Sequence, residues 1–135
     1  MSLINWSDDL SVRVQEIDEQ HKKLIQMINT LHDAMKAGQA KQTLEKTLQD
    51  LAGYAVYHFQ TEEKYMQQFK FSGFQAHKLK HDAFVKKVTV FQEDYRTGKL
   101  GLSLEVMNFL RDWITTHIKE TDKHYSETFR QAGLR

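Results

Sequence analysis

The stretch that decides the fold is residues 41–69, KQTLEKTLQDLAGYAVYHFQTEEKYMQQF. Along it, mostly apolar residues recur at alternating steps of four and three, at Leu44, Leu48, Leu51, Ala55, His58, Glu62, Tyr65 and Phe69. This spacing places them all on one face of an α-helix, which is typical of a helix packed against a core. The stretch therefore predicts one long helix, with histidine and glutamate on its inward-facing seam.

Three further segments have the same period. Their seam residues are Ile17, His21, Leu24, Ile28, Leu31 and Met35; Phe74, His77, His81, Phe84, Val88, Phe91 and Tyr95; and Val106, Leu110, Trp113 and His117. The chain has no proline, and its six glycines fall mostly between these segments. We predict an all-α fold, an up-down-up-down antiparallel four-helix bundle. We expect one domain, 1–135, with an extended N-terminal arm over 1–17 and a bundle over 18–132 that ends in a short tail helix.

The segment boundaries follow from capping residues. We predict helices over about 18–37 with Asp18 as N-cap and Gly38 as the stop, over 41–69, over 74–97, and over 103–119 with Ser103 as cap. Counted along the helices from the turn at 72–73, the inward histidines of the second and third helices lie at less well matched heights. This mismatch favours an end to the second helix one turn earlier. Gly53 lies within a helix, where glycine is unfavourable, so we expect a close helix contact there. Trp6 of the arm is expected to pack on the bundle.

Composition excludes several classes of protein. The chain has 135 residues, no cysteine, and a formal net charge of +1. Thiolate metal sites and disulfides are therefore excluded, and any metal must be held by nitrogen and oxygen. The lysines at positions 78, 80, 86 and 87 favour a solvated helix face over a nucleic-acid surface. No signal sequence or apolar membrane span is evident, so we expect a cytoplasmic protein, and a monomer.

Polar residues occupy positions that the seams assign to the core. Each of the four seams carries histidine, and one carries Glu62. A single inward histidine is usually a hydrogen-bonded core residue, but a buried unpaired carboxylate is costly. Antiparallel packing brings the five histidines and Glu62 to similar heights, so a cation is their simplest common partner. His32 lies three turns from His21 and cannot reach the same metal, and we expect His124 to face solvent.

The chain resembles the hemerythrins, and specifically the single-domain bacteriohemerythrins. The similarity runs nearly end to end. It is carried by Asn5-Trp6-Ser7, Ile17-Asp18-Glu19-Gln20-His21-Lys22-Lys23-Leu24, His58-x3-Glu62, His77-x3-His81 and Trp113-Ile114-Thr115-Thr116-His117-Ile118-x3-Asp122. The resemblance implies a non-haem di-iron centre with an oxo or hydroxo bridge. It implies that one iron is held by His77, His81 and His117 and the other by His21 and His58.

The resemblance also implies that Glu62 and Asp122 bridge the two irons. Asp122 is a ligand that the seams do not predict, because five residues correspond to about 140° on an ideal helix. We therefore expect a local bulge between His117 and Asp122. Without the resemblance, Asp122 could equally cap the tail helix.

The implied function is reversible binding of dioxygen at the open position of the iron held by two histidines. The expected walls of an apolar oxygen pocket are Leu24, Ile25, Trp113, Ile114 and Ile118, with Phe59 as a weaker candidate; ordinary core packing would use the same residues. An oxygen carrier, store or delivery protein, rather than an enzyme, is the first expectation, with an oxygen-consuming protein as a candidate partner. An oxygen or redox sensor that acts through a separate partner, and a di-iron peroxidase or nitric oxide-handling enzyme, remain alternatives. Spacing alone leaves zinc and manganese open.

Overall fold

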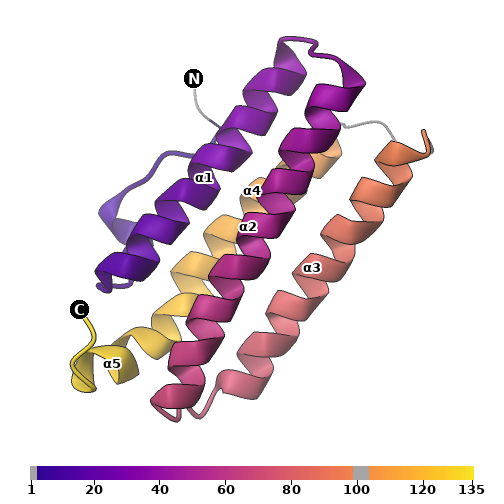
Figure 1. Ribbon diagram of the computed structural model, residues 1–135. Helices are drawn as coiled ribbons and strands as arrows, with labels where there is room; N and C mark the ends of the chain where they lie inside the picture. Colours follow the sequence, from indigo (N-terminus) through magenta and orange to yellow (C-terminus); the bar gives the residue numbers. More distant parts are fainter. Residues whose placement is uncertain (1–2, 99–103) are drawn as a thin grey trace.

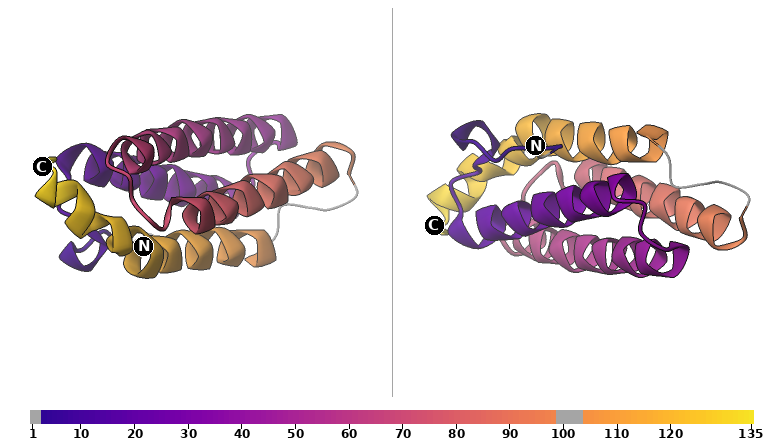
Figure 2. Two further views of the ribbon diagram at one scale, coloured as in Figure 1. Left: turned by 90° about the horizontal axis from the view of Figure 1, so that it is seen from below. Right: turned by 90° about the horizontal axis from the view of Figure 1, so that it is seen from above.

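The computed structural model describes residues 3–98 and 104–135. In these residues four long helices lie antiparallel to their chain neighbours (Figures 1 and 2), which confirms the predicted bundle. They are α1 (Gln15–Lys36), α2 (Lys41–Gln68), α3 (Phe74–Arg96) and α4 (Leu104–Thr116). A short 3-10 helix, η1 (Asp8–Leu10), precedes them, and a π-helix, η2 (His117–Asp122), joins α4 to the tail helix α5 (Lys123–Gln131).

The first helix begins three residues earlier than the sequence predicts. Asp18 is not its N-cap: α1 starts at Gln15, after the extended residue Val14. The Asp18 carboxylate instead accepts hydrogen bonds from the Ser11 hydroxyl at 2.6 Å and from the Val12 amide at 2.8 Å. The prediction failed because Asp18 caps a turn of the preceding arm rather than its own helix. The predicted Ser103 cap lies outside the described residues.

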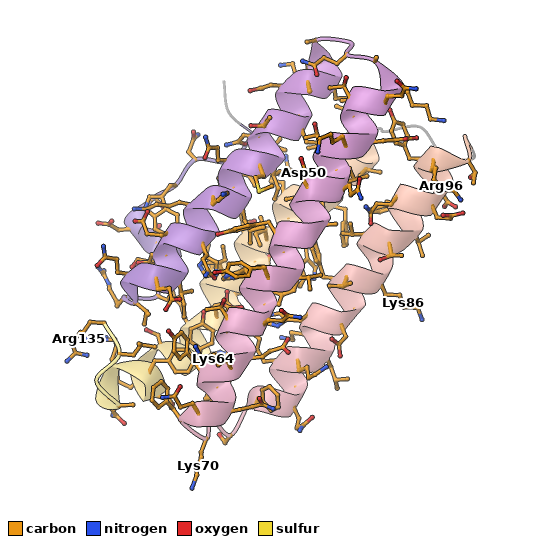
Figure 3. The ribbon with its side chains drawn as sticks, viewed as in Figure 1. Asp50, Lys64, Lys70, Lys86, Arg96 and Arg135 are labelled. Carbon is orange, nitrogen blue, oxygen red and sulfur yellow. The ribbon has the colours of Figure 1, made fainter. Side chains whose placement is uncertain are left out.

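Helix ends at Gly38 and Lys70 have the same geometry. Gly38 stops α1 as predicted, with φ +69°, and the amide of Gln39 donates to the carbonyl of Ala34 at 3.2 Å. This is a Schellman motif. The same pattern ends α2, where Lys70 has φ +55° and the amide of Phe71 donates to the carbonyl of Met66 at 2.8 Å. Lys70 points away from the bundle at this end (Figure 3).

The second helix does not end one turn early. It runs to Gln68, and Glu62 and His81 then lie six residues before that end and seven residues after the start of α3 at Phe74. The two residues are therefore at matching heights across the turn. The predicted early end was wrong because heights have to be counted from the helix ends at Gln68 and Phe74, and not from Ser72–Gly73 between them.

Gly53 makes no close helix contact, contrary to the prediction. A Cβ atom built there would meet nothing within 4 Å, and the residue lines an open groove between α2 and α3. The prediction assumed that glycine in a helix is retained for close packing, and nothing in the structure explains its presence here.

Two hydrophobic clusters fill the fold. The larger one lies between α1, α2, α3 and α4, with Trp6 of the arm packed against it as expected. The smaller one contains Val12, Val14, Ile17, Met66, Tyr125 and Phe129, and it holds α5 against α1 and α2. In the part of the chain that is described, no helix has both the length and the apolar character needed to cross a bilayer.

Candidate metal centre

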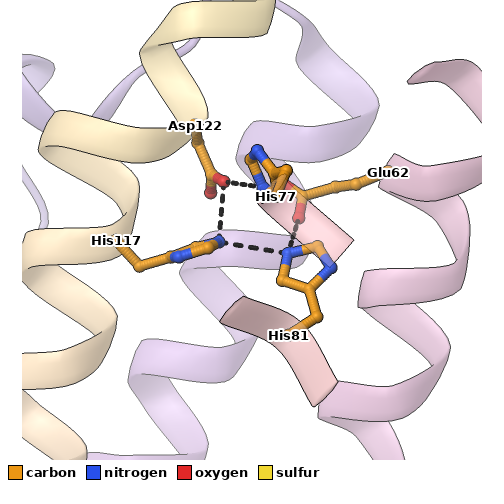
Figure 4. A group of neighbouring side chains, drawn as sticks. All are labelled: Glu62, His77, His81, His117 and Asp122. Atoms are coloured by element: carbon orange, nitrogen blue, oxygen red, sulfur yellow. Dashed lines mark hydrogen bonds and ion pairs between the residues drawn. The ribbon is translucent and has the colours of Figure 1, made fainter. Parts of the chain in front are cut away.

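Seven polar side chains from four elements meet inside the bundle. α1 supplies His21, α2 supplies His58 and Glu62, α3 supplies His77 and His81, and η2 supplies His117 and Asp122. All seven are buried, with at most 4% of any residue exposed. Figure 4 shows five of them pointing toward one another from α2, α3 and η2. The structure thus brings together all seven residues that the sequence and the resemblance predicted to hold metal.

Asp122 faces two separate sets of histidines. Its Oδ1 atom lies 2.9 Å from Nε2 of His77 and 3.0 Å from Nε2 of His117. Its Oδ2 atom lies 3.0 Å from Nε2 of His21, on the other side of the carboxylate. Each oxygen of one carboxylate therefore faces a different group of nitrogen donors.

Glu62 also spans the site. Its Oε1 atom lies 3.2 Å from Nε2 of His81 and 3.4 Å from Nε2 of His58. Its Oε2 atom lies 3.3 Å from Nε2 of His21 and accepts a hydrogen bond from the Tyr125 hydroxyl. A carboxylate oxygen has two lone pairs, so Oε2 can accept from Tyr125 and still face a cation.

The π-helix η2 explains how Asp122 reaches the site. On an ideal α-helix, residues five apart lie about 140° apart around the axis. In a π-helix the hydrogen bonds run from residue i to i+5, which widens the turn and brings such residues onto one face. η2 spans His117–Asp122, so it confirms the expected bulge and aligns the two side chains.

The donor atoms form two groups that share both carboxylates. One group is Glu62, His77, His81, His117 and Asp122, and the other is His21, His58, Glu62 and Asp122. Within each group the donor atoms lie within 4.8 Å of one another, close enough to hold one metal ion. The two groups correspond to the two iron positions that the resemblance implies.

Unpaired donor atoms test whether these residues fit metal ions. Six buried atoms of the site make no hydrogen bond among the described residues, although several lie at ion-pair distance from one another: Nδ1 and Nε2 of His21, Oε1 of Glu62, Nε2 of His77, and both Oδ atoms of Asp122. Buried polar atoms without partners are costly, and native proteins rarely retain them. Imidazole nitrogen and carboxylate oxygen are also the donors that iron accepts. The donor set therefore fits two metal ions.

The metal-free site balances its charges with protons. Burial would lower the pKa of His21, but the adjacent Asp122 and Glu62 carboxylates raise it to about 9. Burial opposes the charge of His81 too, and Glu62 and Glu63 raise the pKa of that ring to about 9. Although burial disfavours both carboxylates, the neighbouring histidines hold the pKa of Glu62 and of Asp122 below its usual value. Two cationic rings thus offset two buried anions.

Three residues of the site were missed by the sequence analysis: Gln20, Glu63 and Tyr125. Oε1 of Gln20 lies 2.7 Å from Nδ1 of His58, and Oε2 of Glu63 lies 2.8 Å from Nδ1 of His81. Tyr125 donates to Glu62, and its position three residues after Asp122 was the available signal. Gln20 and Glu63 directly adjoin ligands in sequence and so point away from the seam, which hides them from a periodicity argument.

Aromatic rings cover two histidines of the larger group. Phe59 stacks on His81 with ring centroids 3.9 Å apart, and Trp113 stacks on His117 at 4.3 Å. The residues predicted to form the oxygen pocket, Leu24, Ile25, Ile114 and Ile118, are buried in the larger cluster, and Trp113 packs against it. His124 is exposed as expected, and the His32 side chain, which is 12% exposed, belongs to neither group of metal donors.

A buried set of five histidines and two carboxylates in an antiparallel helical bundle defines a class of non-haem metal-binding bundle proteins. The family model described as the hemerythrin HHE cation binding domain matches residues 12–129. The chain belongs to the hemerythrin family.

Individual relatives agree with this membership. The chain is 34% identical over 126 residues to a bacteriohemerythrin of Methylococcus capsulatus, covering 93% of this chain and 95% of the relative. It is 31% identical over 132 residues to a bacteriohemerythrin of Pseudomonas aeruginosa, covering 98% and 85%. A crystal structure of wild-type hemerythrin superposes with a TM-score of 0.90 at 33% identity, covering 94% of this chain and 98% of that one.

Proposed function

We propose that this chain holds two iron ions and binds dioxygen reversibly. His77, His81 and His117 would hold one iron, His21 and His58 the other, and Glu62 and Asp122 would bridge them, with an oxo or hydroxo group from solvent. The observation that carries the proposal is that the two oxygens of Asp122 face different groups of histidines, at 2.9 to 3.0 Å. Family membership supports iron as the metal and dioxygen as the ligand.

The unequal number of histidines supports a binding role. Three histidines serve one position and two serve the other, while both carboxylates are shared. The position of His21 and His58 therefore has one protein ligand fewer, which leaves room for a small ligand. Two ferrous ions would supply the two electrons that dioxygen takes up when it binds reversibly.

Apolar walls would protect such a centre. Leu24, Ile25, Ile114 and Ile118 are at most 4% exposed, and Trp113 covers one face of His117. We propose that these residues form the oxygen pocket, with Phe59 beside them. Their role would be to exclude water and external protons, so that bound dioxygen leaves as dioxygen rather than in a reduced form.

The proposal is tested by cycling oxygen over the iron-loaded protein. We expect a visible charge-transfer absorption under air that disappears when oxygen is removed and returns when oxygen is readmitted. The variant His124→Gln, at an exposed residue outside the site, should cycle normally. A colourless protein with two irons per chain would contradict reversible binding. Rapid autoxidation with turnover of a reductant would instead favour a di-iron enzyme.

A further inference from the structure

Two of the site histidines are held from outside by side chains of different charge. Nδ1 of His81 lies 2.8 Å from the carboxylate of Glu63, and Nδ1 of His58 lies 2.7 Å from the amide oxygen of Gln20. Both partner atoms are acceptors, so each ring donates its Nδ1–H outward, and Nε2 is the nitrogen that binds a metal once it is deprotonated. Gln20 and Glu63 therefore set the direction in which each ring can bind a metal.

The two histidines belong to different metal positions. His81 is in the group with three histidines, and His58 is in the group with two. A carboxylate that accepts the outer N–H of a ligand imidazole makes the inner nitrogen more basic. A neutral amide polarises the ring less, because hydrogen bonds to charged groups are about twice as strong as neutral ones. The three-histidine position thus has both more histidines and the more strongly polarised ring, so the outer partners increase the difference between the two metal positions.

We propose that Glu63 and Gln20 are positioning residues that make the two metal positions unequal in affinity. Glu63, acting through His81, makes the three-histidine position fill first and release its metal last. Gln20, acting through His58, leaves the two-histidine position as the weaker one. This inference rests on the two-metal centre of the proposed function, but it concerns metal retention and does not depend on dioxygen.

The surroundings of His81 favour a role for Glu63 beyond holding the ring. Phe59 stacks on His81 with an interplanar angle of 10°, so aromatic packing already fixes the plane of the ring. Glu63 is only 18% exposed, at a cleft between α2 and α3 that also contains Lys78, Asp82 and Lys86. A partly buried carboxylate acts through a lower dielectric than a surface one, so its charge acts on His81 with less screening than that of a surface group.

The test is a zinc titration of the metal-free full chain, followed by NMR of the histidine ring nitrogens. Zinc is redox-inert, so oxygen chemistry cannot affect the result. In the unchanged protein, the first equivalent should shift the signals of His77, His81 and His117, and the second should shift those of His21 and His58. The variant Glu63→Gln keeps an acceptor but loses the charge. In it, the affinity for the first zinc ion should fall about 10-fold or more.

Two further variants separate charge from position. Gln20→Glu should raise the affinity of the two-histidine position, and combining it with Glu63→Gln should narrow or reverse the filling order. Asp82→Asn is the matched control, because Asp82 lines the same cleft but pairs with Lys78 at 2.8 Å rather than with a histidine. It should leave both affinities unchanged.

Specific results would overturn the inference. One is equal filling of both positions by the first zinc equivalent, and another is unchanged zinc affinity in Glu63→Gln. The third is a loss of zinc affinity in Asp82→Asn as large as that in Glu63→Gln. Circular dichroism and the melting temperature of each metal-free variant establish that it folds. Ordered filling in a protein that fails to cycle oxygen would retain this inference and reject the proposed function.

Discussion

Oδ1 of Asp122 lies 3.0 Å from Nε2 of His117 although the two residues are five positions apart on one helical segment. The π-helix between them makes this contact, and the same turn directs Oδ2 of Asp122 toward His21 of α1. A local change in helical winding therefore gives one carboxylate access to both groups of histidines.

Replacing Asp122 by asparagine should reduce metal retention. The change preserves shape but removes a buried negative charge that faces three histidines, so bound cations lose a shared partner. We expect clearly fewer than two irons per chain after gel filtration, measured by atomic emission. Asp112→Asn, at an exposed residue of α4, serves as the control and should keep the full content. Full retention in Asp122→Asn would remove Asp122 from the ligand set.

Removing the Tyr125 hydroxyl should destabilise the metal-free protein. Tyr125 is fully buried and donates to Glu62, so Tyr125→Phe leaves a buried carboxylate oxygen with one partner fewer. The free energy of unfolding in urea should fall by about 1–3 kcal/mol. Tyr57→Phe, at a residue that is 56% exposed, should change it by less than about 0.5 kcal/mol. Equal values for both variants would show that the hydrogen bond adds no stability.

Stability of the metal-free protein should decrease as the pH rises from 6.5 to 9. The pKa values of His21 and His81 are raised from 6.5 to about 9 in the folded chain. A raised pKa stabilises the fold fully below the unfolded value, and the contribution is lost as the pH rises through the folded value. Urea unfolding at pH 6.5, 8 and 9 in the presence of a chelator measures this. Increasing stability over the same interval would contradict the charge balance proposed for the site.

The same raised pKa values make metal uptake proton-coupled. At neutral pH, bound metal must displace the protons of His21 and His81, so loading should release protons and strengthen with pH up to about 9. Calorimetric titration in two buffers that differ in ionisation enthalpy counts the protons released. A heat that is independent of the buffer would indicate that both rings are already neutral.

Two glycines should respond in opposite ways to alanine. Gly53 lies within α2, and an added Cβ would meet nothing within 4 Å, so Gly53→Ala should stabilise the fold by about 0.5–1 kcal/mol. Gly38 has φ +69°, so Gly38→Ala should destabilise it by about 1 kcal/mol. Thermal unfolding of both variants measures the difference. Destabilisation by Gly53→Ala would show that the groove between α2 and α3 needs the missing side chain.

Much of the site was predictable because its residues share the period of the core. His21, His58, Glu62, His77, His81 and His117 continue apolar seams, so a helical pattern alone assigns them inward. Asp122 breaks that pattern, and only the family resemblance identified it. Its placement depends on the π-helix η2, which leads into α5, the helix that the smaller cluster holds against α1 and α2.

The residues around the ligands could not be predicted in the same way. Gln20 contacts a histidine of α2 from α1, and Tyr125 contacts Glu62 across 63 positions. Such contacts depend on the rotation and height of two helices relative to each other, which side-chain packing sets. The start of α1 was also misjudged, because the Asp18 side chain accepts hydrogen bonds from the preceding turn.

The sequence by itself determined that the chain forms four amphipathic helices and that five histidines and Glu62 face one core. A period near 3.6 residues is a local property, and burial follows from it directly. The tertiary structure decided which carboxylate oxygen faces which histidine, how Asp122 turns inward, and which outer partner each histidine has. Those features depend on ångström-scale distances between helices, and only the packing of the whole bundle fixes such distances.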